Sequence, residues 1–138
     1  MTTKSERSIN VLVIDDDAIG RTLLCETLRE HYSELTEVTT PIGASRIVSQ
    51  ERIDVVVLDV EMPNLSGDKL AKLFRTNPRL AHVGVVLVSG TGDDQLALLG
   101  LECQADATVT KAKVRADLVK AVQVAWEKSQ RRRGRSTQ

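Results

Sequence analysis

The segment VVVLDVEMP, from Val55 to Pro63, decides the fold class of this sequence. It opens with four apolar residues, three of them β-branched, which is typical of a strand buried on both faces of a parallel sheet. Asp59 comes next, and a carboxylate inside such a run would lose its hydration. The sequence therefore predicts that Asp59 lies at the end of the strand, where water or a cation can reach it.

Length and composition indicate one globular domain. The chain has 138 residues, of which 41% are hydrophobic, so disorder is not expected. It has no long apolar run and no charged leader, and we expect a soluble, cytoplasmic protein that does not enter a membrane. Cys25 and Cys103 are too few for a disulfide framework and are predicted to be buried, reduced thiols. No cluster of Cys and His indicates zinc.

The formal net charge is zero, but basic residues gather at the C-terminus. Residues 127–138 are predicted to form a flexible tail or a truncated linker after a domain of residues 9–126, with residues 1–8 as an N-terminal tail. No aromatic residues are interleaved with these charges. Nucleic-acid binding is therefore not expected of this domain alone, and contact of the basic segment with nucleic acid or an anionic membrane is the weaker alternative.

Short apolar runs predict five strands, at residues 9–14, 35–38, 53–58, 83–88 and 107–109. Segments with helical spacing of apolar residues alternate with these runs. The alternation implies right-handed crossovers and a parallel sheet covered on both faces. We predict an α/β, flavodoxin-like (βα)5 fold, a doubly wound five-stranded sheet with strand order 2-1-3-4-5.

The helices have recognisable starts and predicted buried faces. Asp17 is placed to cap the first helix, and Pro41 is predicted to open the second. The faces predicted to be buried include Ile19, Leu73 and Leu101. The leucine-rich segment LALLGL fits either core packing or a surface for a partner.

Ligands of open parallel sheets gather at the carboxyl ends of the strands. The polar residues that follow the predicted strands are Asp15, Asp16, Asp17, Asp59, Ser89, Gly90, Thr91, Thr110 and Lys111. Because the first and third strands are predicted neighbours, Asp15, Asp16 and Asp59 should converge. Carboxylates this close repel unless a proton or a cation intervenes. Mg²⁺ would accept carboxylate oxygens and leave a position for a phosphoryl oxygen.

Lys111 and Ser89 are predicted to face these acids with an ammonium group and a hydroxyl group. Together with Mg²⁺, such groups can hold the equatorial oxygens of a phosphoryl group during transfer. Asp59 is the best candidate to receive that group, because carboxylates can form acyl phosphates.

Four segments, VLVIDDD, VVVLDVEMPNLSG, VVLVSG and ADATVTK, occur in an order that resembles the receiver domain of bacterial response regulators over residues 8–126. The resemblance implies that Asp59 is phosphorylated by the phosphohistidine of a histidine kinase or phosphotransfer protein. It implies that Mg²⁺ is bound by Asp59, by Asp16 directly, by Asp15 through water and by the backbone carbonyl of Glu61.

The resemblance also assigns the remaining site residues. Lys111 would pair with the phosphoryl group and Ser89 would move toward it, while the Glu61 side chain would modulate hydrolysis. Residues implied to shape the site are Met62, Pro63, Gly67 and the small Gly90. His31 and His82 have no surroundings typical of a phosphohistidine and are predicted to be structural.

The implied function is a signalling switch rather than an enzyme, although the domain would catalyse its own phosphorylation from small donors and its own dephosphorylation. A downstream partner or a missing output domain would detect the conformational change. The last two helices and the fifth strand are the family's usual partner surface and suggest a possible homodimer.

Two residues depart from the family pattern. Thr108 stands where an aromatic ring often reports the movement of the hydroxyl residue, so we expect the signal to travel through residues 89–94 and the helix that follows. Ala112 stands where proline with a cis bond is common. A cis bond to alanine costs about 2.5–4 kcal/mol, so the Lys111–Ala112 bond is predicted to be trans.

Two alternatives use the same residues differently. In a haloacid-dehalogenase-like phosphohydrolase, LDVE would be a variant nucleophile motif, and steady turnover of phosphate monoesters would favour this function. A pseudo-receiver would share the fold but act only as a docking module, which the acidic pair, Asp59, Ser89 and Lys111 argue against.

Overall fold

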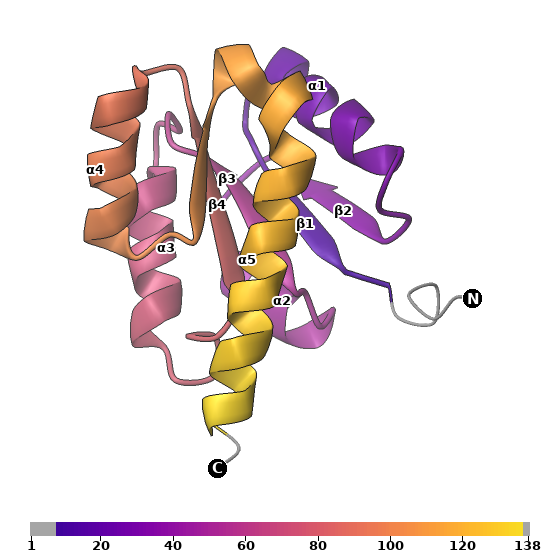
Figure 1. Ribbon diagram of the computed structural model, residues 1–138, viewed down its shortest axis with the longest axis vertical. Coiled ribbons are helices and arrows are strands. Elements are labelled where there is room, and N and C mark those ends of the chain that lie inside the picture. The colour runs from indigo at the N-terminus through magenta and orange to yellow at the C-terminus, as the bar shows by residue number, and fades with distance from the viewer. Residues whose placement is uncertain (1–7, 137–138) are drawn as a thin grey trace.

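The computed structural model describes residues 8–136, in which strands and helices alternate along the chain (Figure 1). The elements are β1 (Val11–Ile14), α1 (Ala18–Arg29), β2 (Leu35–Val38), α2 (Ala44–Gln50), β3 (Val55–Asp59), α3 (Gly67–Thr76), β4 (Gly84–Ser89), α4 (Asp93–Cys103), β5 (Ala107–Thr110), the 3₁₀ turn η2 (Lys111–Lys113) and α5 (Val114–Ser136).

The strands form one parallel sheet in the order β2-β1-β3-β4-β5, which confirms the predicted fold class and strand order. In the central pairing, Ile14 lies opposite Leu58. The residues that follow these two positions, Asp15 and Asp59, therefore emerge side by side at the carboxyl edge of the sheet.

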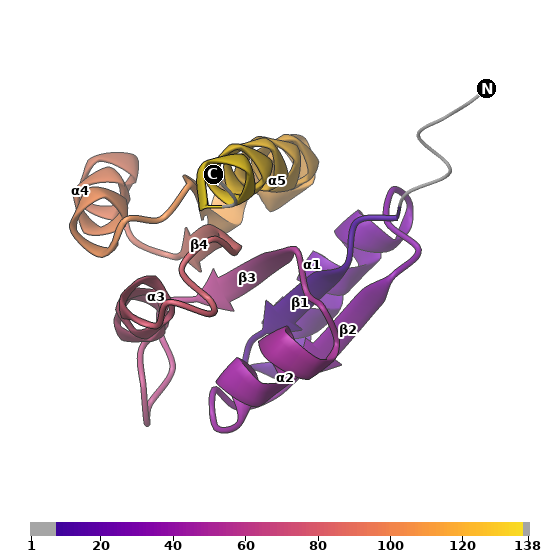
Figure 2. The same cartoon turned by 90° about the horizontal axis from the view of Figure 1, so that it is seen from below.

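Successive side chains of the central strands enter two separate cores, as the alternation of a strand requires. Leu12, Leu58 and Leu87 belong to the core under α2, α3 and α4. Val13 and Val57 belong to the core under α1 and α5. Figure 2 shows α5 on one side of the sheet and α2 and α3 on the other. Burial on both faces explains why these strands are continuously apolar.

Helix α5 lies very close to β4. A Cβ atom at Gly84 would be 2.8 Å from the carbonyl oxygen of Ala125, so the absence of a side chain lets the two backbones approach. The inner face of α5 includes the fully buried Leu118, Val122 and Ala125.

Several element boundaries differ from the prediction. The second helix begins at Ala44 and not at Pro41, because Gly43 takes a left-handed conformation (φ 83°) immediately before it. The Pro41 carbonyl accepts a hydrogen bond from the Ala44 amide, so Pro41 belongs to the turn that leads into the helix. The third and fourth strands end at Asp59 and Ser89, one residue later than expected.

The prediction of buried helical faces is wrong for three residues. Ile19 is 82% exposed, Leu101 is 77% exposed and Leu73 is 52% exposed. Helical spacing identifies the direction of the apolar face but does not set its width. These side chains fall beside the strip of each helix that contacts the sheet.

Residues 127–134 do not form the irregular tail that the sequence predicted, because α5 continues to Ser136. The Arg132 guanidinium donates to the Asp106 carboxylate at 2.8 and 2.9 Å and to the carbonyl oxygens of His82 and Val83 at 3.1 Å. These bonds tie the final turns of the helix to the sheet. Most of the predicted N-terminal tail lies outside the described residues.

Asp106 is the centre of a buried ion network. Its side chain is only 5% exposed, and it accepts from the backbone amide of Val85 and from the guanidinium groups of Arg75 and Arg132. Arg75 also donates to the Val83 carbonyl at 2.6 Å. The network joins α3, α5 and the segment that leads into β5.

Both cysteines are buried free thiols, as predicted, and burial raises the pKa of Cys25 to about 11. Within the described residues, no helix has the length and hydrophobicity that crossing a membrane requires.

Candidate functional site

Three carboxylates meet at the carboxyl edge of the sheet, where β1 and β3 end. Asp15 and Asp16 follow β1, and Asp59 is the last residue of β3. One oxygen of each lies within 4.8 Å of the others. The structure thus brings together the three acids that the sequence placed near one another.

These acids differ in their exposure to solvent. Asp15 and Asp59 are buried, whereas Asp16 is exposed. Burial raises the pKa of Asp15. Burial, reinforced by the negative charge of Asp15, raises the pKa of Asp59 to about 6, although Lys111 opposes the shift. In the absence of a cation, the paired buried carboxylates therefore tend to keep a proton.

Asp15 has one oxygen available to a metal ion. Its Oδ1 accepts from the Asp17 amide at 2.9 Å, whereas its buried Oδ2 has no hydrogen-bond partner among the described residues. A Cβ atom at Gly20 would lie 2.7 Å from Oδ2, so the glycine leaves room beside this oxygen. An all-oxygen donor set with an unpartnered buried oxygen fits Mg²⁺ better than a softer metal.

Asp17 performs the capping role that the sequence predicted. Its Oδ2 accepts from the Gly20 amide at 2.7 Å and so satisfies one of the free donors at the start of α1.

Lys111 lies directly after β5 and reaches the acids from the opposite side. Its Nζ is 3.1 Å from Asp59 Oδ1 and 3.5 Å from Glu61 Oε1. The neighbouring Lys113 instead pairs with Asp93 at 2.8 Å on the surface. Of these two lysines, it is therefore Lys111 that contributes positive charge to the acidic cluster.

The Glu61 side chain makes contacts that sequence reasoning missed. Its Oε2 accepts a short hydrogen bond from the buried Ser89 hydroxyl, and its Oε1 accepts from the Gly90 amide at 3.2 Å. With Lys111 also nearby, one carboxylate engages three groups that are well suited to bind phosphoryl oxygens. The sequence predicts no role for Thr91 either, but its hydroxyl lies 3.1 Å from Ser89 Oγ. A flexible side chain in a loop leaves no periodic signal that could have predicted these contacts.

The loop between β3 and α3 is held against the end of β3. A Cβ atom at Gly67 would lie 2.5 Å from the Asp59 carbonyl oxygen, so only glycine permits this approach. The Gly67 amide donates to the Val60 carbonyl, and Met62 is buried beneath the loop. Both residues therefore shape the loop as predicted, and Pro63 lies within it.

The two departures from the family pattern have clear structural counterparts. Thr108 lies against α4, with its Cγ2 2.6 Å from the position that a Cβ atom would take at Gly100. The space beside β5 is thus filled by a small side chain and a close helix backbone. The Lys111–Ala112 peptide bond is trans, as predicted. The aromatic residues lie in or against the two cores, Phe74 in the core under α2, α3 and α4, and Tyr32 and Trp126 in or against the core under α1 and α5.

Neither histidine joins the acidic cluster. His31 follows α1, and His82 lies in the segment before β4, at the opposite edge of the sheet from Asp59. Both positions agree with the prediction that these residues do not belong to the site.

Comparison with known proteins identifies the family. The response regulator receiver domain matches residues 11–123. A protein-glutamate methylesterase/protein-glutamine glutaminase of Paraburkholderia xenovorans is 38% identical over 114 residues, which is 78% of this chain and 30% of that protein. A protein of the same name from Bordetella pertussis is 35% identical over 113 residues, or 78% and 31% of the two chains. This chain thus spans about a third of the length of these curated relatives.

Solved structures share the fold. A receiver domain of a histidine kinase from Syntrophus aciditrophicus superposes with a TM-score of 0.75 at 26% identity, over 87% of this chain and 91% of that one. The response regulator domain of Thermotoga maritima CheB gives a TM-score of 0.73 at 24% identity, over 88% and 98%. Together with the family match over residues 11–123, these similarities show that the chain belongs to the response regulator receiver domains of two-component signalling.

Proposed function

We propose that this domain is a phosphorylation switch in which Asp59 accepts a phosphoryl group from the phosphohistidine of a histidine kinase or phosphotransfer protein. One observation carries the proposal: Asp15, Asp16 and Asp59 converge within 4.8 Å, with the Lys111 ammonium group 3.1 Å from Asp59. In the transfer, an Asp59 oxygen forms a bond to phosphorus as the phosphorus–nitrogen bond breaks. The departing imidazole keeps the bonding electron pair.

The residues that would hold Mg²⁺ are the side chains of Asp16 and Asp59, the backbone carbonyl of Glu61 and, through water, Asp15. The bound ion would supply positive charge to the acids and to a phosphoryl oxygen. Asp59 must be ionised to attack phosphorus. Because its pKa is raised to about 6 when the acids are close together, a cation beside it favours the reactive form.

Lys111, Ser89 and the Gly90 amide are proposed to bind the oxygens of the phosphoryl group. Lys111 already contacts Asp59, and the other two are fixed at the end of β4. Because the Glu61 carboxylate occupies all three donors in the unphosphorylated domain, it has to leave them when the phosphoryl group arrives. Its departure would free Ser89 to follow the new group.

The phosphoacceptor proposal can be tested by intact mass spectrometry. After incubation with a small acyl phosphate and Mg²⁺, the full chain is expected to gain one phosphoryl group, and digestion should place that group on the peptide that contains Asp59. Addition of EDTA should prevent the gain, because the acids then lack their cation. Unchanged mass with Mg²⁺ present, or a phosphoryl group on another peptide, would contradict the proposal.

Substitution of Glu61 tests whether its carboxylate competes with the phosphoryl group. Glu61→Gln should accept phosphoryl from the same donor about three- to tenfold faster than wild type, because a negative charge near the site is removed. Initial rates of mass gain measure the effect. Glu102→Gln, an exposed change on α4, should leave the rate unchanged. A slower Glu61→Gln reaction would show that the carboxylate assists acceptance instead.

The domain is proposed to be regulatory, with a downstream protein or an output domain that reads its state in the cytoplasm. The relatives named methylesterase/glutaminase are about three times the length of the matched segment, which supports an output component distinct from the receiver. Residues 89–94 and α4 are the proposed route of the signal. Leu98 and Leu101 of α4 are exposed and are available to a partner or to a second copy of the domain.

A further inference from the structure

The Ser89 hydroxyl has every one of its hydrogen-bonding positions filled. Its oxygen accepts from the Thr91 amide at 3.1 Å and lies 3.1 Å from the Thr91 hydroxyl oxygen, while its proton is donated to the Glu61 carboxylate. A hydroxyl group offers one proton and can accept two hydrogen bonds. Ser89 therefore has to give up a partner before it can bind a phosphoryl oxygen.

The hydrogen bond between the two hydroxyl groups has a definite direction. The carboxylate oxygen of Glu61 accepts, so the single proton of Ser89 is committed to that bond. The Thr91 hydroxyl is then the donor to Ser89 Oγ. Thr91 consequently holds the Ser89 oxygen twice, once through its backbone amide and once through its side chain.

These two bonds from Thr91 differ in what they require of the sequence. A backbone amide two residues after a serine often donates to the serine hydroxyl in a turn, and every residue except proline could supply it. The second bond comes from the side chain, which valine, of nearly the same shape, would not provide. The side-chain hydroxyl is therefore the specific contribution of Thr91.

Ser89 and Thr91 lie in different surroundings, although they are two residues apart. Ser89 is fully buried at the end of β4, where it lies opposite Thr110 of β5. Thr91 is exposed in the loop that leads to α4. A substitution of an exposed loop residue creates no cavity in the core, so the Thr91 hydroxyl can be removed while the strand stays intact.

We propose that Thr91 is a positioning residue, which holds the Ser89 hydroxyl in its resting place and so lowers the affinity of the domain for a phosphoryl group on Asp59. The inference rests on the proposed phosphorylation of Asp59. Departure of Glu61 releases the Ser89 proton, but the oxygen that carries this proton is still held by Thr91. Movement of Ser89 toward the phosphoryl group has to break or lengthen both of these bonds, and each of them opposes the movement.

Binding of beryllofluoride in the presence of Mg²⁺ tests the proposal at equilibrium, because this anion mimics a phosphoryl group on a carboxylate and is not transferred. The full chain is titrated, and the bound anion is measured by fluorine NMR. Thr91→Val loses the hydroxyl and should bind beryllofluoride about two- to tenfold more tightly than wild type. Thr91→Ser keeps the hydroxyl and should retain the affinity of wild type.

Removal of the Ser89 hydroxyl shows whether Thr91 acts through it. In a Ser89→Ala background, Thr91→Val should no longer change the affinity, because no hydroxyl remains for Thr91 to hold. An equal gain in affinity with and without the Ser89 hydroxyl would overturn the proposal. Wild-type affinity of Thr91→Val, or the same gain in Thr91→Ser as in Thr91→Val, would also overturn it.

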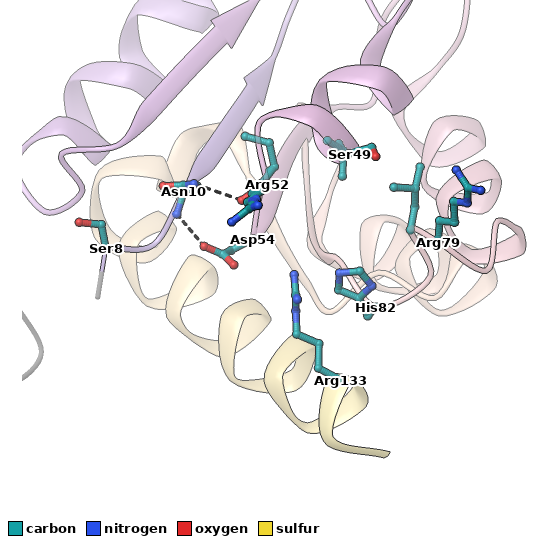
Figure 3. Close-up of a pocket in the computed structure, with 11 residues that line it drawn as sticks. Ser8, Asn10, Ser49, Arg52, Asp54, Arg79, His82 and Arg133 are labelled. Carbon is teal, nitrogen blue, oxygen red and sulfur yellow. Dashed lines mark hydrogen bonds between the residues drawn. The ribbon is translucent and has the colours of Figure 1, made fainter. Parts of the chain in front are cut away.

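Ser49 provides a control hydroxyl away from the acids. It is exposed on α2 and lines a hollow at the opposite edge of the sheet, where the strands begin (Figure 3). Ser49→Ala should leave the affinity for beryllofluoride unchanged, and a gain equal to that of Thr91→Val would contradict a specific role of Thr91. Absence of binding to wild type, or undiminished binding to Asp59→Asn, would instead contradict the proposed phosphorylation of Asp59.

Discussion

Replacement of Asp59 by Asn is expected to abolish phosphoryl acceptance and, in metal-free buffer at about pH 8, to stabilise the domain by about 1–3 kcal/mol. The amide cannot form an acyl phosphate. It also removes one of two buried charges that lie side by side, which burial and Asp15 make unfavourable. Loss of the contact with Lys111 offsets part of the gain.

The same substitution should change how stability depends on pH. The pKa of Asp59 is about 6 in the folded chain and 3.8 for an ordinary aspartate, so the folded state holds its proton more tightly. The proton on Asp59 therefore stabilises the folded state fully below about pH 4, and this contribution is lost as pH rises through about 6. Wild type should therefore lose stability over this window, and Asp59→Asn should lose less.

Urea unfolding in EDTA at several pH values measures both effects, and intact mass measures acceptance. Asp16→Asn removes a charge from the same cluster at an exposed position and is expected to shift metal-free stability by less than about 0.5 kcal/mol. Addition of Mg²⁺ should stabilise wild type more than Asp59→Asn. Equal stability of wild type and Asp59→Asn at every pH would show that the acids do not strain the metal-free fold.

Asp106→Ala is expected to destabilise the domain by about 3–5 kcal/mol, because it leaves the buried Arg75 and the Arg132 guanidinium without their shared carboxylate. The Val85 amide would also lose its acceptor. Thermal or urea unfolding, followed by circular dichroism, measures the loss. The final turns of α5 should become less protected from hydrogen exchange, since Arg132 would no longer be anchored there.

Asp93→Ala provides the matched comparison. Asp93 forms an ion pair with Lys113 at 2.8 Å, as short as the contact between Arg132 and Asp106, but both side chains of this pair are largely exposed. Solvent screens such a pair, and the substitution should have no measurable effect on unfolding. Similar losses for Asp93→Ala and Asp106→Ala would show that burial does not decide the strength of these pairs.

The fold and the acidic cluster could be predicted because both depend on strand patterns. Continuously apolar runs such as residues 55–58 identify buried parallel strands, and strand order then places Asp15 and Asp59 together. Lys111 was predictable for the same reason, since it directly follows the last strand. Each of these residues is positioned by backbone geometry that the sequence pattern determines.

Features that depend on long, flexible side chains could not be predicted. The hydrogen bond from Ser89 to Glu61 depends on the rotamer of the Glu61 side chain, which lies in a loop. The extension of α5 depends on Arg132 reaching Asp106, 26 residues earlier in the chain. The exposure of Ile19 and Leu101 depends on how each helix sits on the sheet. Such contacts join distant parts of the chain and have no local spacing to reveal them.

α4 and α5 are not held equally firmly against β4 and β5. α5 rests its backbone directly on Gly84 and is fastened at its far end by Arg132, whereas α4 buries only Leu96, Gly100 and Cys103. We therefore expect a structural change at the proposed phosphorylation site to move α4 more easily than α5.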